Sequence, residues 1–272
     1  NGVLRSIQRN GVPDLETMEN DIDRISIATS HPKWLVEKWV EQYGVHDTER
    51  MCEMNLVPPH QSARANTAKA KVEEVLQMLT DQGFSVEKGE LAEESIVSLK
   101  GNMAYSNAYK NGYMTIQDES SMLVAKALGV EKEDEVYDCC AAPGGKTTHI
   151  AELLKGTGTV ISTDLHDHKV KLIKEQADRL HLSNIEAQAL DSRKAKEIFK
   201  EEQFDKVLVD APCSGFGVIR RKPDLKYTKT MEDIKQLASI QLAILKEVAP
   251  LVKKGGTLVY STCTIDKEEN AD

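Results

Sequence analysis

Residues 135–149 read EVYDCCAAPGGKTTH, and this stretch decides the fold. A short apolar strand over 135–138 runs into small residues and two glycines, and a helix is predicted over 146–154. Glycine and alanine let a ligand approach the backbone, while the N–H groups at the start of a helix favour a carboxylate or phosphate. The stretch therefore predicts a strand, a cofactor loop and a helix that bind a nucleotide-like ligand.

The alternation of strands and helices continues towards the C-terminus. Further strands are predicted over 158–163, 184–189, 204–209 and 257–260, and further helices over 168–180 and 231–251. This alternation is typical of an α/β, doubly wound fold with a parallel, Rossmann-like sheet. Ligands of such a fold lie beyond the carboxyl ends of the strands, so the loops after the strands are the candidate functional segments.

The N-terminal part predicts smaller units. Residues 1–10 have the pattern of a helix end, and an acidic linker follows over 11–24. Apolar side chains have helical spacing over 31–43. A helix over 67–80 and a strand over 94–99 then predict a small α+β unit.

The composition limits the class of protein. The chain has 272 residues, a formal net charge of −9 and five cysteines. No apolar run approaches the ~20 residues of a membrane span, and no signal-peptide pattern opens the chain, so we expect a cytoplasmic protein with no membrane partner. The cysteines are odd in number and widely spaced, and no His/Cys cluster has zinc-site spacing, so we expect neither a disulfide framework nor a metal.

The glycine-rich loop has an alternative interpretation. Gly145, Lys146 and Thr147 imitate the end of a phosphate-binding P-loop, which would make the protein a nucleotide hydrolase. That motif requires a glycine five positions before Gly145, and Cys140 stands there. The alternative is therefore disfavoured.

Two aspartates follow two successive predicted strands. Asp164 comes where a doubly wound fold presents an acid to ribose hydroxyls, and Asp191 is placed to contact the exocyclic amine of adenine. A strand-end aspartate is more often a helix cap. Two of them beside a glycine-rich turn favour a nucleoside site.

Two cysteines follow the next two strands. Cys213 lies in DAPCSG (210–215), and Cys263 lies in STC (261–263). A buried cysteine is usually a small hydrophobic residue. Both of these are flanked by Ser, Thr, Pro or Gly at the ligand-binding edge, so catalysis is favoured.

These motifs together resemble the RNA cytosine-5 methyltransferase family, which includes the Sun/Fmu and Nop2/NSUN enzymes. The segments GVIRRKPDLKY (217–227), GYMTIQDESS (112–121) and HPKWLVEKW (31–39) are most similar to the Sun/Fmu, RsmB-type branch, which acts on small-subunit 16S ribosomal RNA. The resemblance covers essentially the whole chain. It implies a sheet that binds S-adenosyl-L-methionine, preceded by a small α+β, RRM-like subdomain.

The resemblance also implies a division of the chain. The parts are a remnant of an N-terminal helical RNA-binding domain with a linker over 1–30, the substrate-side subdomain over 31–112, and the catalytic domain over 113–272. The family pattern leads us to expect truncation at both ends, with C-terminal strands missing. We expect a monomer whose partner is small-subunit ribosomal RNA.

The family assigns roles to matching positions. Cys263 resembles the nucleophile that adds to C6 of cytosine, Cys213 its partner in proton removal or release, and Asp210 the residue that contacts the base. The implied cofactor contacts are Cys140, Ala141, Ala142, Pro143, Gly144, Gly145, Lys146, Asp164, Asp191 and Asp210. The product would be 5-methylcytosine. A DNA cytosine methyltransferase would instead place the nucleophile at Cys213, and the STC motif favours the RNA arrangement.

Basic residues suggest where RNA binds. Arg220, Arg221 and Lys222 follow the DAPCSG loop, within a group that also holds Lys226 and Lys229, and are expected to contact phosphates. A weaker group holds Arg64, Lys69 and Lys71. A methyltransferase-like RNA-binding assembly factor without catalysis is the remaining alternative.

Overall fold

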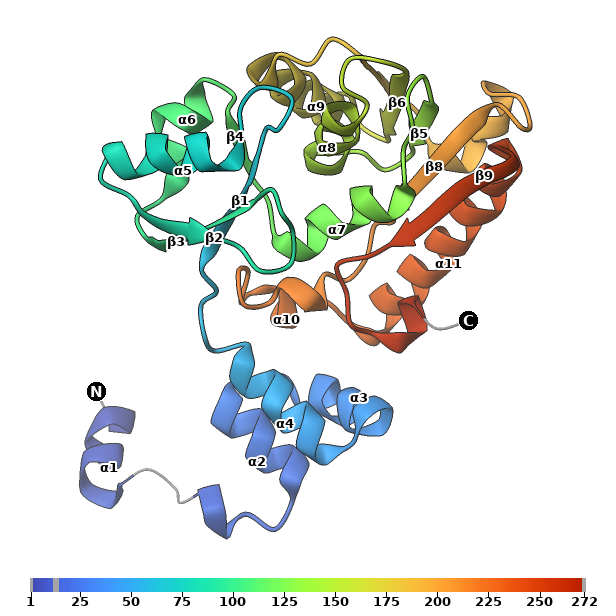
Figure 1. Ribbon diagram of the computed structural model, residues 1–272. Helices are drawn as coiled ribbons and strands as arrows, with labels where there is room; N and C mark the ends of the chain where they lie inside the picture. Colours follow the sequence, from blue (N-terminus) through green and yellow to red (C-terminus); the bar gives the residue numbers. More distant parts are fainter. Residues whose placement is uncertain (1, 12–14, 271–272) are drawn as a thin grey trace. The chain divides into compact units, whose positions relative to one another are not determined.

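The computed structural model describes residues 2–11 and 15–270, and the chain divides into two compact units (Figure 1). Unit 1 combines residues 1–59, 214–235 and 263–272, whereas unit 2 combines residues 60–213 and 236–262. The chain therefore passes between the units directly after Cys213 and directly before Cys263. The three-part division expected from the sequence stays a prediction.

Unit 2 contains a five-stranded parallel sheet with the order β7-β6-β5-β8-β9. Its strands are β5 (Glu135–Asp138), β6 (Thr159–Asp164), β7 (Ile185–Ala189), β8 (Phe204–Asp210) and β9 (Val252–Ser261). Strands β8 and β9 end in register, with Asp210 opposite Ser261. This sheet confirms the predicted α/β class with a parallel sheet.

Helices cover both faces of the parallel sheet (Figure 1). The helices are α7 (Glu119–Leu128), α8 (Gly145–Leu153), α9 (Asp167–Leu180) and α11 (Met231–Val248). Val136 and Leu208 pack with α7 and α8, whereas Tyr137, Val207 and Val209 pack with α11 on the other face. Side chains alternate between faces along a strand, so these nearly continuous apolar strands are buried on both sides.

Unit 2 also contains a four-stranded antiparallel sheet with the order β2-β3-β1-β4. Its elements are β1 (Gln61–Ala65), α5 (Val72–Asp81), β2 (Ser85–Lys88), β3 (Ser95–Lys100), α6 (Asn107–Lys110) and β4 (Met114–Ile116). The β-α-β-β-α-β order is that of a ferredoxin-like fold. Ala63, Ala65 and Ile96 pack with Val75 and Leu79 of α5 in its core.

Unit 1 is helical in its N-terminal part. Its elements are α1 (Gly2–Asn10), α2 (Asp21–Thr29), α3 (Lys33–Tyr43), α4 (Val45–Met54) and α10 (Leu225–Thr228). Trp39 is fully buried, and its ring centroid lies 5.9 Å from that of Phe216. The segment after Cys213 is thus anchored in the core formed by α2 and α3.

Several elements differ from the sequence prediction. The expected acidic linker over 11–24 is partly wrong, because Asn20 caps helix α2, which buries Ile25. Strand β9 begins at Val252 and runs through Gly255 and Gly256, whereas the predicted strand covered only 257–260. A Cβ at Gly256 would lie 2.6 Å from the carbonyl oxygen of Asp205, so close strand packing requires this glycine.

Among the described residues, no helix is both long enough and apolar enough to cross a membrane.

Candidate active site

The glycine-rich loop joins β5 to α8 in unit 2, as the sequence predicts. The Ala141 N–H donates to the carbonyl oxygen of Thr163 at 2.9 Å, and the Gly144 N–H donates to Ala141 at 2.8 Å. Gly144 has φ +103°, and a Cβ there would lie 3.1 Å from the Cα of Ile173 in α9. Only glycine combines that conformation with that close packing. The loop is therefore held in a fixed curve at the N-terminus of α8.

Asp164 ends β6 beside this loop. It is 8% exposed. Its carboxylate accepts a hydrogen bond from the Ala142 N–H at 3.3 Å, and the Lys169 ammonium lies 3.5 Å away. The structure thus brings Asp164 next to the residues implied to bind the cofactor.

Asp191 has a local partner. It caps the short 3-10 helix Ser192–Glu197, because its carboxylate accepts from the Arg193 N–H at 3.0 Å. The Arg193 guanidinium donates to both carboxylate oxygens, at 2.9 Å and 2.7 Å, and this hydrogen bonding lowers the pKa of Asp191. A contact with adenine stays a prediction.

Lys146 and Asp210 form an ion pair. The Lys146 ammonium lies 2.6 Å from one carboxylate oxygen of Asp210, and the Ser261 hydroxyl donates to the other oxygen at 2.9 Å. Lys146 belongs to α8, Asp210 ends β8 and Ser261 ends β9. Three elements therefore fix the orientation of the Asp210 carboxylate, which the sequence could not show.

Asp138 is a buried acid beneath the same loop. It is fully buried, and the Thr147 hydroxyl donates to its carboxylate at 2.6 Å. Burial raises the pKa of Asp138 to about 7, and the negative charge of Asp210 acts in the same direction. Asp138 is not among the site residues predicted from the sequence, although an acid that ends an apolar strand before a glycine-rich loop is the relevant signal.

All five cysteines lie in the described ranges, and none forms a disulfide. Cys52 and Cys139 are buried, Cys140 and Cys213 are half-buried, and Cys263 is exposed. Burial raises the pKa of Cys52 to about 11, and the neighbouring Cys140 together with burial raises that of Cys139. Exposure therefore favours Cys263 as the reactive thiol.

The two candidate catalytic cysteines follow neighbouring strands. Cys213 comes three residues after Asp210, the last residue of β8, and Cys263 comes two residues after Ser261, the last residue of β9. Parallel strands end at the same edge of a sheet. Both cysteines thus leave the sheet at the edge where ligands of this fold bind.

The backbone of Cys263 packs against a glycine segment of unit 1. The Gly217 N–H donates to the carbonyl oxygen of Cys263 at 2.9 Å. A Cβ at Gly217 would lie 2.8 Å from that oxygen, and one at Gly215 would lie 4.0 Å from the Cys263 sulfur. Gly217 therefore leaves room for the backbone of Cys263, whereas a Cβ at Gly215 would only make an ordinary contact with the sulfur.

The residues that follow the two cysteines are connected. Ser214 and Thr264 have hydroxyl oxygens 2.7 Å apart. The Glu269 carboxylate accepts from the Ser214 N–H at 2.9 Å and from its hydroxyl at 2.5 Å. This buried cluster ties the start of the loop after β8 to the loop after β9.

The basic residues divide into two groups. Arg221 and Lys222 are exposed, and Arg220 is half-buried and donates to the carbonyl oxygen of Val57 at 2.9 Å. Lys226 is buried, with its ammonium 3.5 Å from the carbonyl oxygen of Thr29, so its inclusion in a surface group is wrong.

Arg64 is also wrongly placed in a surface group. It is 1% exposed and forms a buried ion pair with Glu152. The sequence offers no local signal for this burial, because the partner lies 88 residues away.

Within residues 2–11 and 15–270, no group of three or more His, Cys, Asp or Glu side chains could hold a metal ion.

Comparison with known proteins identifies the family. Residues 125–272 match the family described as 16S rRNA methyltransferase RsmB/F, and residues 31–104 match the ferredoxin-like domain of RsmF/B-like methyltransferases. Over 270 residues the chain is 58% identical to the probable ribosomal RNA small subunit methyltransferase B of Bacillus subtilis (strain 168), covering 99% of this chain and 60% of that relative.

Two solved structures are similar to this chain over most of its length. The crystal structure of PH0851 is 34% identical with a TM-score of 0.88, and the match covers 96% of this chain and 58% of that one. A methyltransferase homolog protein from Pyrococcus horikoshii is 28% identical with a TM-score of 0.81, and the match covers 93% and 80% of the two chains.

The chain spans about 60% of the length of the curated relatives it matches. The family match covers more than half of the chain and includes the loop after β8, the loop after β9 and the glycine-rich loop. The resemblance noted in the sequence is therefore confirmed: the chain belongs to the RsmB/F family of 16S rRNA methyltransferases.

Proposed function

We propose that this protein transfers a methyl group from S-adenosyl-L-methionine to C5 of a cytosine in small-subunit ribosomal RNA, with Cys263 as the nucleophile. The observation that carries the proposal is that a cysteine follows each of two adjacent parallel strands, β8 and β9, beside the strand that leads into the glycine-rich loop. The Bacillus subtilis relative, named as a small-subunit ribosomal RNA methyltransferase, supports this substrate. We also propose that the protein acts in the cytoplasm.

The residues around the glycine-rich loop fit S-adenosyl-L-methionine. Residues 140–146 curve around the N-terminus of α8, where N–H groups and the helix dipole favour a carboxylate such as that of the methionine part. Asp164 lies against this loop and would accept hydrogen bonds from ribose hydroxyls. Asp191 and Asp210 complete the proposed contacts. When bound, the cofactor supplies an electrophilic methyl group on a sulfonium.

Cytosine C5 requires activation before it can accept a methyl group. The Cys263 thiolate adds to C6, which forms an S–C6 bond and moves the electron pair of the C5–C6 double bond to C5. C5 then forms a bond to the methyl group while the bond from that methyl group to the sulfonium breaks, which would leave a neutral thioether. Loss of the C5 proton and cleavage of the S–C6 bond restore the aromatic ring and release the thiolate.

The ion pair in unit 2 supports this chemistry. Charge develops along the N3/N4 edge of the base during thiolate addition, and Asp210 would hydrogen-bond that edge. The 2.6 Å contact with Lys146 and the 2.9 Å contact with Ser261 hold its carboxylate in one orientation. Cys213 is assigned to removal of the C5 proton or release of the product.

RNA binding would use exposed basic residues. Arg221 and Lys222 follow the loop that begins at Cys213, and their side chains are exposed to phosphates. The Nε–H of Arg220 donates to Val57, and its other guanidinium N–H groups would donate to phosphates. A base within a duplex would need to be extruded before Cys263 could reach C6.

Methyl transfer tests the proposal directly. Labelled S-adenosyl-L-methionine is incubated with unmodified 16S ribosomal RNA and either the protein, its Cys263→Ala variant, or the control Cys52→Ala, which changes a buried cysteine of α4. We expect label at cytosine C5, lost with Cys263→Ala and kept with Cys52→Ala. Full function in cells without methyl transfer would instead support an RNA-binding assembly factor. Hydrolysis of ATP without cofactor binding would support the P-loop alternative.

A further inference from the structure

The antiparallel sheet is buried on both faces around its strand β1. One face packs against α5, as the core residues show. The opposite face carries Ser62, Arg64 and Thr115, which are 6%, 1% and 5% exposed. RNA-recognition folds of similar topology present this face to unstacked bases. Here the face is buried and polar, with Arg64 in contact with Glu152 of α8 and Thr115 in contact with Arg179 of α9.

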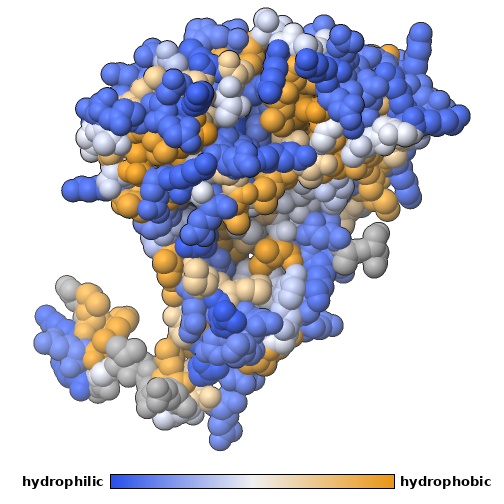
Figure 2. Space-filling view, in the orientation of Figure 1, coloured by the Kyte–Doolittle hydropathy of each residue, from blue (hydrophilic) through white to orange (hydrophobic). Residues whose placement is uncertain are grey.

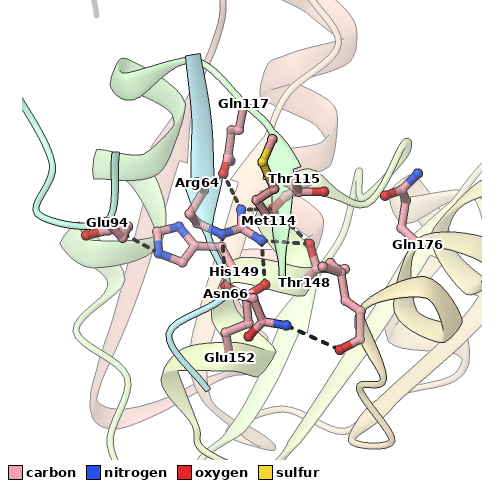
Figure 3. Close-up of polar contacts among 12 residues, drawn as sticks. Arg64, Asn66, Glu94, Met114, Thr115, Gln117, Thr148, His149, Glu152 and Gln176 are labelled. Carbon is pink, nitrogen blue, oxygen red and sulfur yellow. Dashed lines mark hydrogen bonds and ion pairs between the residues drawn. The ribbon is translucent and has the colours of Figure 1, made fainter. Parts of the chain in front are cut away.

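Arg64 makes the central contact of this face (Figure 3). Its Nε and Nη2 donate to the two carboxylate oxygens of Glu152, each at 2.9 Å. Nη2 also donates to the Thr148 hydroxyl at 3.1 Å, while Nη1 donates to the Gln117 side chain and, at 2.9 Å, to the carbonyl oxygen of Gly145. All five N–H donors of the guanidinium therefore have an acceptor.

Two of these contacts reach the glycine-rich loop. Gly145 is the first residue of α8 and the second glycine of the loop. The Thr148 hydroxyl donates to the carbonyl oxygen of Gly144 at 2.9 Å, so Arg64 reaches Gly144 through Thr148 as well. Both glycines that curve around the proposed methionine site are thus fixed from β1.

We propose that Arg64 is a positioning residue for S-adenosyl-L-methionine, and that the ferredoxin-like subdomain is part of the cofactor site through this side chain. The inference rests on the proposed function, because it takes residues 140–146 as the cofactor loop. A loop held by a preorganised guanidinium loses less conformational freedom when the ligand binds, which raises affinity. The N–H donors of Arg64 are all taken by acceptors of the protein, so its effect on the cofactor is indirect, through the loop.

A second contact between the same sheet and α8 provides a matched control. Glu94, directly before β3, lies 3.2 Å from Nε2 of His149 in α8 (Figure 3). It also accepts a hydrogen bond from the Lys126 ammonium at 3.0 Å. Burial lowers the pKa of His149 to about 4, so its ring is neutral near pH 7. This contact joins the same elements but has no hydrogen bond to Gly144 or Gly145 among the described contacts.

The test compares cofactor and RNA binding in three variants. Arg64→Lys keeps the charge but cannot satisfy five acceptors, and Arg64→Met with Glu152→Leu replaces the buried ion pair by apolar groups that preserve folding. Glu94→Gln is the control. Calorimetric titration measures the dissociation constant for S-adenosyl-L-methionine, and steady-state assays measure KM for cofactor and for RNA separately.

We expect both Arg64 variants to weaken cofactor binding roughly 10-fold, in line with the loss of one or two hydrogen bonds, while KM for RNA changes less than about 2-fold. Glu94→Gln should bind cofactor like the unaltered protein. Folded Arg64 variants with unaltered cofactor affinity would overturn the inference and leave the proposed function standing. Loss of folding in both Arg64 variants would also overturn the inference, because it would show that Arg64 is required for the stability of the fold. An unaltered protein that fails to bind the cofactor would sink the proposed function itself.

Discussion

Replacement of Asp138 by asparagine should remove a pH dependence of stability. Burial raises the pKa of Asp138 from 3.8 to about 7 in the folded protein. Between these two values the folded state holds a proton that the unfolded state has lost, so the free energy of unfolding falls as pH rises. Asparagine carries no ionisable group and can still accept the Thr147 hydrogen bond.

The magnitude follows from the size of the shift. A difference of about 3 pKa units corresponds to roughly 4 kcal/mol, and about 2.5 kcal/mol of it is lost between pH 5 and pH 8. Relative to Asp138→Asn, the unaltered protein should therefore lose about 2.5 kcal/mol of unfolding free energy over that range.

Urea unfolding followed by far-UV circular dichroism measures this effect. Both tryptophans, Trp34 and Trp39, lie in α3 of unit 1, so their fluorescence would not report on the sheet that holds Asp138. The control is Asp205→Asn. Burial acts to raise the pKa of Asp205, but the Lys253 ion pair outweighs it and lowers the pKa below its ordinary value of 3.8, so this carboxylate stays ionised between pH 5 and pH 8. An Asp138→Asn variant with the same slope as the unaltered protein would refute the reasoning.

Three further changes test the site. Lys146→Met should slow single-turnover methyl transfer roughly 100-fold, because Asp210 loses the ammonium that orients it; a change below about 2-fold would contradict this. Glu269→Gln should slow formation of the protein–RNA adduct roughly 10-fold, since it weakens the hydrogen bonds from Ser214; an unchanged adduct rate would show that this cluster does not position the cysteines. Arg221→Ala should weaken RNA binding and reduce the slope of log affinity against log salt by about 1, whereas an unchanged slope in filter-binding titrations would place this side chain away from phosphate.

The parallel sheet could be predicted because its strands are short apolar runs bounded by glycine-rich turns. The strands of the antiparallel sheet could be predicted only in part. Strand β1 has the sequence QSARA, whose apolar residues are two alanines, and β2 has SVEK, with one apolar residue, so neither gives a strong strand signal. The burial of β1 depends on partners elsewhere in the chain, whereas β2 is largely exposed. The face of β1 that carries Ser62 and Arg64 is polar and would be predicted to be exposed. It is buried because Arg64 has Glu152 as a counter-ion.

The motif residues of the site could be predicted from the sequence. The protonation of the buried acid beside them and the contacts that orient them could not. Residues 140–146 and Asp210 stand out through their spacing after strands. The raised pKa of Asp138 depends on complete burial, and the orientation of Asp210 depends on Lys146 and Ser261. These are tertiary properties that no local pattern encodes.

The most direct test of the central claim is to trap the bond between the protein and its RNA. Small-subunit ribosomal RNA that carries 5-fluorocytidine cannot lose its C5 substituent as a proton, so the S–C6 bond formed by the nucleophile would persist. Peptide mass spectrometry should then find the nucleotide on Cys263, and the Cys263→Ala variant should form no adduct. An adduct on Cys213, or methylated RNA made by the Cys263→Ala variant, would contradict the assignment of Cys263 as the nucleophile.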